Sequence, residues 1–163
     1  MTAAPQTKAQ PAIHLRLATV DDVDALLLLF ATFFRESHYQ PALKFDPVIA
    51  AKYLRSAIGS GFSPHIVAVD DGRIVAQISY HIDNSFTDKL AVLDEVYALP
   101  EYRSTPVGRA LVHAAMDMAR SELGPGGCMH IPITSGHKSM PTLINLFKKF
   151  GAEEIGTVLR KVL

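Results

Sequence analysis

Two neighbouring features in the middle of the chain have residue types that can do chemistry. Asp94 and Glu95 stand side by side in Leu90–Leu99, a mostly apolar run typical of a strand. The next element, Pro106–Leu123, has helical spacing, and a helix starts with unpaired amides and the positive end of its dipole. Carboxylates attract cations, and a helix start can bind a phosphate. The candidate site is therefore Leu93–Ala110.

Strand geometry limits how Asp94 and Glu95 can act together. Adjacent side chains on a strand point to opposite faces, so only one of the two can face a given cleft unless a β-bulge intervenes. A pair of solvated acidic residues without a chemical role is the alternative interpretation.

The surrounding elements predict an α/β fold with a mixed sheet. Alternating or β-branched runs indicate strands, and three- and four-residue apolar spacings between capping residues indicate helices. The predicted strands are Ile13–Leu17, His65–Asp70, Arg73–His81, Leu90–Leu99, Cys128–Thr134 and Glu154–Val162; the predicted helices run from the cap Thr19 to Ser37, from the cap Asp46 to Ile58, from Pro106 to Leu123 and from Met140 to Phe150. This order implies a central, mostly antiparallel sheet with helices on both faces.

Length and composition favour one domain of residues 13–163, preceded by a disordered tail of residues 1–12. Lys plus Arg balances Asp plus Glu at 16 each, so we expect no nucleic-acid partner. The longest apolar runs are well short of the roughly 20 residues that span a bilayer, so we expect no membrane partner.

Cys128 is the only cysteine, which favours the cytoplasm. Seven histidines form no metal-binding motif, so we expect no metal; the exposed edges of such a sheet allow a homodimer.

The element order and the run from Leu93 to Leu111 resemble the GNAT superfamily of N-acetyltransferases. Members of that superfamily have a pyrophosphate loop with the pattern Arg/Gln-x-x-Gly-x-Gly/Ala after a strand, and Pro100-Glu101-Tyr102 is similar to its usual lead-in. The resemblance implies an acyl-CoA N-acyltransferase fold over Ile13–Leu163. It also implies acetyl-CoA as the acyl donor and an amine as the acceptor.

The resemblance also implies which residues bind the coenzyme. Backbone groups near a bulge at the end of the strand would hold the thioester and pantetheine arm, the loop and helix start would hold the pyrophosphate, and a later helix would contribute one further position. These coenzyme-binding residues are Tyr97, Ala98, Leu99, Arg103, Ser104, Thr105, Val107, Gly108, Arg109, Ala110 and Phe147.

Two positions depart from the family pattern. Pro106 stands where the first glycine of the loop is usual, and proline has no amide hydrogen to donate to a phosphate. With Thr105 as N-cap and Pro106 in the first helical position, the helix start itself stays sound. Phe147 stands where a tyrosine commonly protonates the leaving thiolate, so an acid at that position is excluded.

The expected function is therefore N-acetyl transfer from acetyl-CoA to a primary amine, of a small molecule or of a protein or peptide, by direct attack. An ammonium group with a pKa of about 10.4 must lose its proton first. Asp94 and Glu95 are the candidate catalytic residues, and either can be the base or anchor the amine. The alternative is a catalytically weak or inactive domain that binds an acyl-CoA or a partner protein on the same fold.

Overall fold

The computed structural model describes residues 13–39, 43–85, 90–133 and 140–156. Within them the chain forms a five-stranded sheet in the order β1-β2-β3-β4-β5. Neighbouring strands are antiparallel up to β4, and β5 runs parallel to β4. The strands are β1 (His14–Leu17), β2 (His65–Asp70), β3 (Arg73–Asp83), β4 (Leu90–Ala98) and β5 (Cys128–His130).

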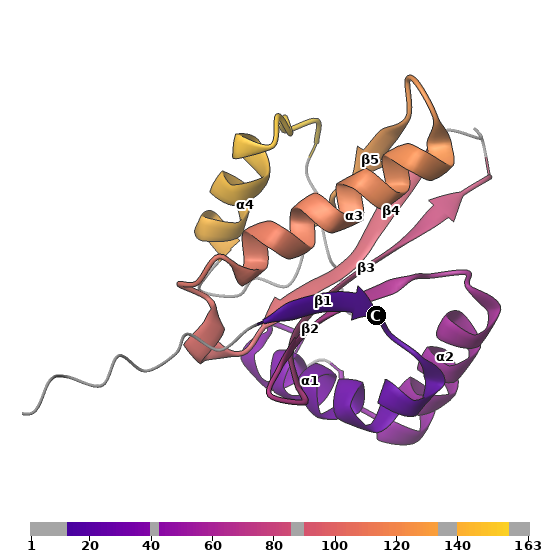
Figure 1. Ribbon diagram of the computed structural model, residues 1–163, viewed down its shortest axis with the longest axis vertical. Coiled ribbons are helices and arrows are strands. Elements are labelled where there is room, and N and C mark those ends of the chain that lie inside the picture. Colours follow the sequence, from indigo (N-terminus) through magenta and orange to yellow (C-terminus); the bar gives the residue numbers. More distant parts are fainter. Residues whose placement is uncertain (1–12, 40–42, 86–89, 134–139, 157–163) are drawn as a thin grey trace, which may run out of the picture.

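Helices cover both faces of the sheet, as the sequence predicts (Figure 1). α1 (Val23–Glu36) and α2 (Pro47–Ser60) lie on one face, and α3 (Val107–Leu123) and α4 (Met140–Lys149) lie on the other. Short 3₁₀ turns precede α1 (η1, Val20–Asp22) and α3 (η2, Pro100–Tyr102). None of the helices in the described ranges is long and apolar enough to cross a bilayer.

Local sequence signals account for the boundaries of several elements. Asp46 caps α2, because its carboxylate accepts hydrogen bonds from two amides of the first turn at 2.9 and 3.1 Å. Gly61 ends α2 in the left-handed conformation. Asp71 and Gly72 both have positive φ, 47° and 75°, which is the backbone that a two-residue hairpin between β2 and β3 requires.

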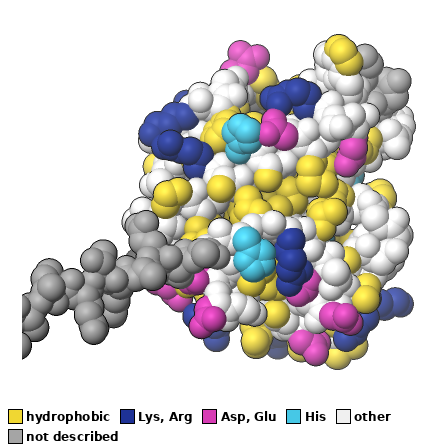
Figure 2. Space-filling view, in the orientation of Figure 1, with side chains coloured by type: hydrophobic (Ala, Val, Ile, Leu, Met, Phe, Trp, Pro, Cys, Tyr) yellow, Lys and Arg dark blue, Asp and Glu magenta, His cyan; other side chains and the backbone are white. Residues whose placement is uncertain are grey.

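The core lies on both faces of β2, β3 and β4. Most residues of β2 and β3 are buried, and the helices contribute an apolar stripe each, including Leu26, Leu54 and Leu111, which are fully buried. At the sheet edge formed by β1 the core comes close to the surface. Figure 2 shows hydrophobic side chains there between the two helical layers.

Some predicted boundaries differ from the structure. The helix predicted from Thr19 begins as a 3₁₀ turn, where the amide of Thr19 donates to Asp22 Oδ2 at 2.8 Å, and α1 proper starts at Val23. Pro106 is the N-cap of α3, so the prediction of Thr105 as cap and Pro106 as first helical residue is wrong by one position.

The predictions for the C-terminal half are too long. β5 ends at His130, and residues 131–133 continue without strand pairing, so the strand predicted to reach Thr134 is shorter in the described part of the chain. Of the strand predicted for Glu154–Val162, residues 154–156 are not in a strand and the remainder lies outside the described residues, as does the predicted tail of residues 1–12.

Candidate active site

A β-bulge lies in the middle of β4, at the acidic pair. Ser79 of β3 pairs with Glu95, and the next residue, Tyr80, pairs with Leu93. Asp94 is therefore an extra residue on β4 that has no partner in the β3–β4 register. The resemblance to the GNAT superfamily implies a bulge near the end of this strand, and the structure places the bulge several residues earlier.

The bulge gives Asp94 and Glu95 the same orientation. Tyr97, two residues after Glu95, donates a hydrogen bond to Glu36 of α1 at 3.1 Å, so Glu95 also belongs to the face covered by α1 and α2. The carboxylate of Asp94 accepts a hydrogen bond at 2.8 Å from Ser63, which follows α2, and so points to that face as well. Without the extra residue the two carboxylates would lie on opposite faces.

Both carboxylate oxygens of Asp94 are occupied. Oδ2 accepts the hydrogen bond from Ser63, and Oδ1 lies 2.6 Å from Nδ1 of His81 on β3. The His81 ring is stacked on Phe62, with ring centroids 5.5 Å apart and 18° between the planes. Asp94 is thus held by neutral and basic side chains from two sides.

Glu95 has the opposite environment. Its Oε1 atom is buried and has no hydrogen-bond partner within the described residues. Burial raises the pKa of Glu95 to about 8, and the negative charge of Asp94 adds to the effect. Glu95 can therefore hold or release a proton near neutral pH, which is what a base acting on an amine requires.

Two more polar side chains are buried on this face of the sheet. His65 pairs in register with Ser79, and Gln77 pairs with Tyr97, so both share the orientation of Glu95. His65 Nδ1 lies 3.2 Å from Gln77 Oε1, whereas His65 Nε2 and Gln77 Nε2 have no partner among the residues described. Burial lowers the pKa of His65, which favours its neutral ring.

The opposite side of β4 offers an open edge. β5 pairs only with Leu90–Val92, so Leu93–Ala98 lacks a strand partner on that side in the described structure. Beyond this edge begins the 17-residue helix α3, where the amides of Gly108 and Arg109 have no hydrogen-bond partner among the described residues. Open backbone groups beside a helix start can hold an extended chain that carries a phosphate.

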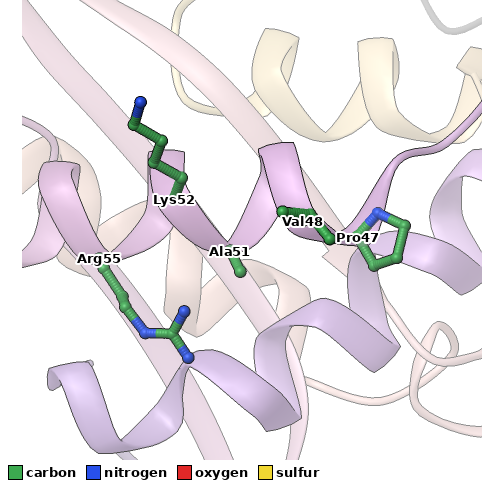
Figure 3. A pocket seen from close by; sticks show the side chains of 5 residues that line it. All are labelled: Pro47, Val48, Ala51, Lys52 and Arg55. Atoms are coloured by element: carbon green, nitrogen blue, oxygen red, sulfur yellow. The ribbon is translucent and has the colours of Figure 1, made fainter.

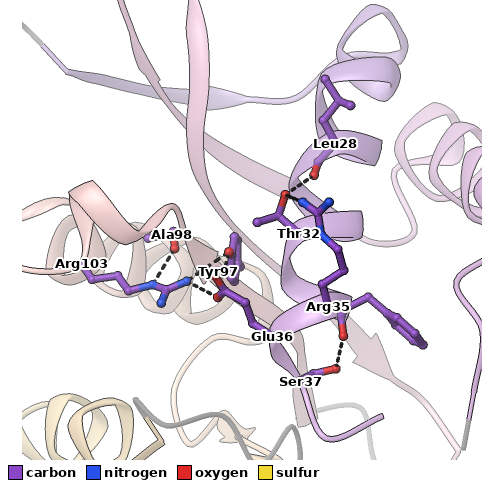
Figure 4. Close-up of polar contacts among 9 residues, drawn as sticks. Leu28, Thr32, Arg35, Glu36, Ser37, Tyr97, Ala98 and Arg103 are labelled. Atoms are coloured by element: carbon purple, nitrogen blue, oxygen red, sulfur yellow. Dashed lines mark hydrogen bonds and ion pairs between the residues drawn. The ribbon is translucent and has the colours of Figure 1, made fainter. Parts of the chain in front are cut away.

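Arg103 is engaged with its own protein rather than free at the loop surface. Its Nε donates to the carbonyl of Ala98 at 3.0 Å, and its Nη2 donates both to the hydroxyl of Tyr97 at 3.0 Å and to the carboxylate of Glu36 (Figure 4). The guanidinium also lies over the Tyr97 ring. Burial and the hydrogen bond to Glu36 raise the pKa of Tyr97 to about 12.

The other predicted coenzyme-binding residues divide by exposure. Ser104, Arg109 and Ala110 are exposed and Gly108 is half-buried at the start of α3, whereas Tyr97, Leu99, Val107 and Phe147 belong to the core. Thr105 is half-buried, and its hydroxyl donates to the carbonyl of Tyr102 at 2.7 Å. Phe147 is only 2% exposed. The direct role of each residue in binding remains a prediction.

Sequence reasoning did not single out Ser63, His81 or Glu36. Each becomes a site residue through a contact across the fold, and Ser63 lies in a loop without a motif. Of the three, only His81 could have been found from the sequence. Strand alternation places its side chain on one face of the sheet, and the bulge places Asp94 on that same face. No group of three His, Cys, Asp or Glu side chains suited to a metal ion occurs in the described ranges.

Two shallow hollows lie along α2. One, of about 390 Å³, is lined by Tyr53, Ser56, Ala57, Ser60 and Phe62, and so adjoins the His81–Phe62 stack. The other, of about 470 Å³, is lined by Pro47, Val48, Ala51, Lys52 and Arg55 (Figure 3). Tyr53 connects the first hollow to the carboxylates. Burial raises the pKa of the Tyr53 hydroxyl, and the negative charges of Asp94 and Glu95 raise it further.

Comparisons with known proteins agree with this architecture. The chain matches the model of the acetyltransferase (GNAT) family over residues 24–152. No curated protein matches the chain. Solved structures do match it.

An aminoglycoside N-acetyltransferase in complex with CoA has a TM-score of 0.74 at 12% identity, covering 95% of this chain and 97% of that one. A predicted acetyltransferase from Clostridium acetobutylicum, solved with acetyl-CoA, has a TM-score of 0.71 at 12% identity, covering 91% of this chain and 95% of that one. A ribosomal-protein-alanine N-acetyltransferase from Brucella melitensis biovar Abortus has a TM-score of 0.66 at 14% identity, covering 92% of this chain and 99% of that one. At these identities the structures establish the shared fold, and with the family match over most of its length the chain belongs to the acetyltransferase (GNAT) family.

Proposed function

We propose that this protein is an N-acetyltransferase that moves the acetyl group of acetyl-CoA to a primary amine by direct attack, with Glu95 as the base. The observation that carries this proposal is the bulge at Asp94, which sets a buried carboxyl group of raised pKa beside the open edge of β4. Family membership supports the reaction class.

The residues on the open edge fit the coenzyme. The unpaired amides of Gly108 and Arg109 suit the pyrophosphate, and the edge of Leu93–Tyr97, which has no strand partner beside it, suits the extended pantetheine arm. When bound, acetyl-CoA supplies an activated thioester. Pro106 contributes no amide at this helix start, so fewer donors are available there than in the usual loop.

The base assignment follows from the different surroundings of the two carboxylates. Asp94 already binds Ser63 and His81 with both oxygens, whereas Glu95 has a free buried oxygen. A carboxylate with a pKa of about 8 is also a stronger base toward an ammonium group than an ordinary glutamate. Glu95 therefore takes the proton, and the charge of Asp94 favours a cationic acceptor on the same face of the sheet.

The test follows thiol release from acetyl-CoA with a panel of primary amines. Glu95→Gln removes the base without changing the shape of the side chain, so we expect kcat to fall by about 10²- to 10⁴-fold. The matched control is Glu153→Gln, an exposed glutamate after α4, which we expect to leave the rate unchanged. No thiol release with any amine, or an unchanged rate in Glu95→Gln, contradicts the proposal.

The pH dependence distinguishes Glu95 from the substrate. Activity should rise with pH and reach half of its plateau near pH 8, because only ionised Glu95 can accept a proton. This inflection should stay in place when amines of different pKa are compared. An inflection that moves with the amine shows that the free amine, not Glu95, limits the rate.

One observation favours a second candidate, an acyl-CoA-binding domain with little or no turnover. Phe147 is buried and cannot protonate a leaving thiolate. Saturable binding of acetyl-CoA without thiol release, with the same affinity in the Glu95→Gln variant, would identify this function.

A further inference from the structure

The chemistry proposed above produces a proton that Glu95 cannot release directly. An ammonium acceptor loses two protons when it becomes an amide; the departing thiolate takes one, and the other must reach solvent. The carboxyl oxygen Oε1 of Glu95 is buried. Each turnover therefore needs a route from Glu95 to the surface.

The titratable groups around Glu95 come from four elements, α2, β2, β3 and β4. Tyr53 lies on α2 and titrates above neutral pH, because burial and the two carboxylates raise its pKa. His65 on β2 is only 2% exposed, so it cannot exchange protons freely with solvent. Asp94 is adjacent on β4, and His81 lies on β3, two residues beyond the partner of Glu95 and on the same face.

His81 has the environment of an oriented imidazole. Asp94 fixes its Nδ1 at 2.6 Å, and the stack on Phe62 fixes the plane of the ring. Asp94 is itself held by Ser63, which is fully buried, so the carboxylate does not swing away. With Nδ1 bound to a carboxylate, Nε2 is left as the proton-accepting nitrogen, and the carboxylate stabilises the imidazolium that forms.

His81 also reaches the surface, since 26% of its side chain is exposed and the neighbouring Phe62 is 60% exposed. We propose that the Asp94–His81 pair is the proton exit of the acceptor site: Nε2 of His81 takes the proton that Glu95 has removed from the amine and passes it to solvent. This inference rests on the proposed acetyl transfer. No hydrogen bond joins Glu95 to His81 in the described structure, so the proposed transfer between them requires a bridging solvent molecule.

The transfer leaves every group as it began. The ammonium nitrogen loses a proton to the Glu95 carboxylate, the Glu95 carboxylic acid loses it to Nε2, and the imidazolium loses it to a base in solution. Asp94 stays ionised throughout and acts as a positioning residue. His81 acts as an acid–base group of the acceptor site.

The test is the dependence of the rate on a small diffusible base. We expect His81→Gln to lower kcat by about 10- to 100-fold, and rising imidazole concentrations to restore much of the rate, because free imidazole replaces the missing ring. The wild type should be insensitive to imidazole. His81→Asn, with a shorter side chain, should behave in the same way, and thermal melting of both variants checks that they are folded.

Asp94→Asn tests the positioning role. It keeps the shape of the side chain but removes the charge that holds the imidazolium, so kcat should fall and respond to imidazole less than in His81→Gln. The matched control is His113→Gln on α3, because His113 also lies against a carboxylate, 2.7 Å from Asp117, but on the exposed surface of the other helical layer. That variant should behave as the wild type.

The outcomes separate this inference from the proposed function. An active wild type whose kcat is unchanged in His81→Gln, or a folded His81→Gln whose lost rate imidazole does not restore, overturns the proton exit alone. A wild type that releases no thiol with any amine overturns the acetyl transfer, and with it the proton exit.

Discussion

Arg103 and Glu36 form an ion pair that joins the loop before α3 to the last residue of α1. Both side chains are 27% exposed, so the pair is shielded from solvent more than a surface pair is. The same guanidinium holds the carbonyl of Ala98 at the end of β4. One arginine thus connects the end of α1, the end of β4 and the predicted pyrophosphate loop.

Breaking this pair should weaken coenzyme binding more than catalysis. In Glu36→Gln we expect the KM for acetyl-CoA to rise by about 3- to 10-fold with a small change in kcat, because Arg103 loses a charged hydrogen-bond partner that positions the loop. Steady-state kinetics at varied acetyl-CoA concentration measure the change. Glu101→Gln is the control, since Glu101 pairs with Arg73 at 3.6 Å on the open surface; an equal effect in both variants contradicts the positioning role.

Burial of Glu95 should make the protein less stable at alkaline pH. The folded-state pKa of about 8 lies above the ordinary value of 4.5, so the folded state retains a proton that the unfolded state releases between these pH values. The free energy of unfolding should therefore fall as pH rises from 4.5 to 8 and level off above 8. One unit of pKa is worth about 1.4 kcal/mol, so the full shift sets an upper limit of about 5 kcal/mol.

Urea unfolding at pH 5 and pH 9 measures this loss. Glu95→Gln has no proton to lose at this position, so its stability should change less over the same range, and at pH 9 it should be the more stable of the two proteins. Equal pH dependence of variant and wild type would show that Glu95 is not the group responsible.

Replacing Pro106 should strengthen coenzyme binding. Pro106→Ala restores an amide at the start of α3, and alanine can adopt the φ of −64° found there. One added donor to a phosphate is worth about 1 kcal/mol, which corresponds to an affinity for coenzyme A that is tighter by about fivefold. Calorimetric titration measures the affinity, and a weaker or equal affinity shows that the loop does not use this amide.

The contact between Tyr80 and Glu122 should matter for stability alone. The buried Tyr80 hydroxyl donates to Glu122 at 2.9 Å and links β3 to α3, on the face of the sheet opposite to Asp94 and Glu95. Tyr80→Phe should lower the free energy of unfolding by about 1 kcal/mol and leave kcat unchanged. A fall in kcat in the folded variant would show that this side of the sheet takes part in the reaction.

The fold followed from the sequence because its signals are local. Asp46, the Asp71–Gly72 turn and the glycines after helices each act within a few residues, and the structure confirms the elements that they bound. The predicted end of a strand is wrong where that end depends on the neighbouring strand with which it pairs. β5 is short because only Leu90–Val92 of β4 runs beside it, and the sequence of Cys128–Thr134 does not contain that information.

The site was less predictable for the same reason. Asp94 and Glu95 are conspicuous in the sequence, but their relative orientation depends on one extra residue in the register between β3 and β4. The partners that distinguish them, Ser63 and His81, come from other parts of the chain. Arg103 could be identified as a loop residue, whereas its contact with Glu36 depends on how α1 packs.

The unpaired stretch of β4 also bears on how the protein should be handled. A strand edge without a neighbour invites pairing with another chain, and the edge along Leu93–Ala98 is such a place within the described sheet. A coenzyme that occupies this edge should therefore stabilise the folded protein, by an amount that grows with the logarithm of the coenzyme concentration relative to its Kd, and should suppress aggregation. We expect purification in the presence of coenzyme A to improve the yield of soluble protein.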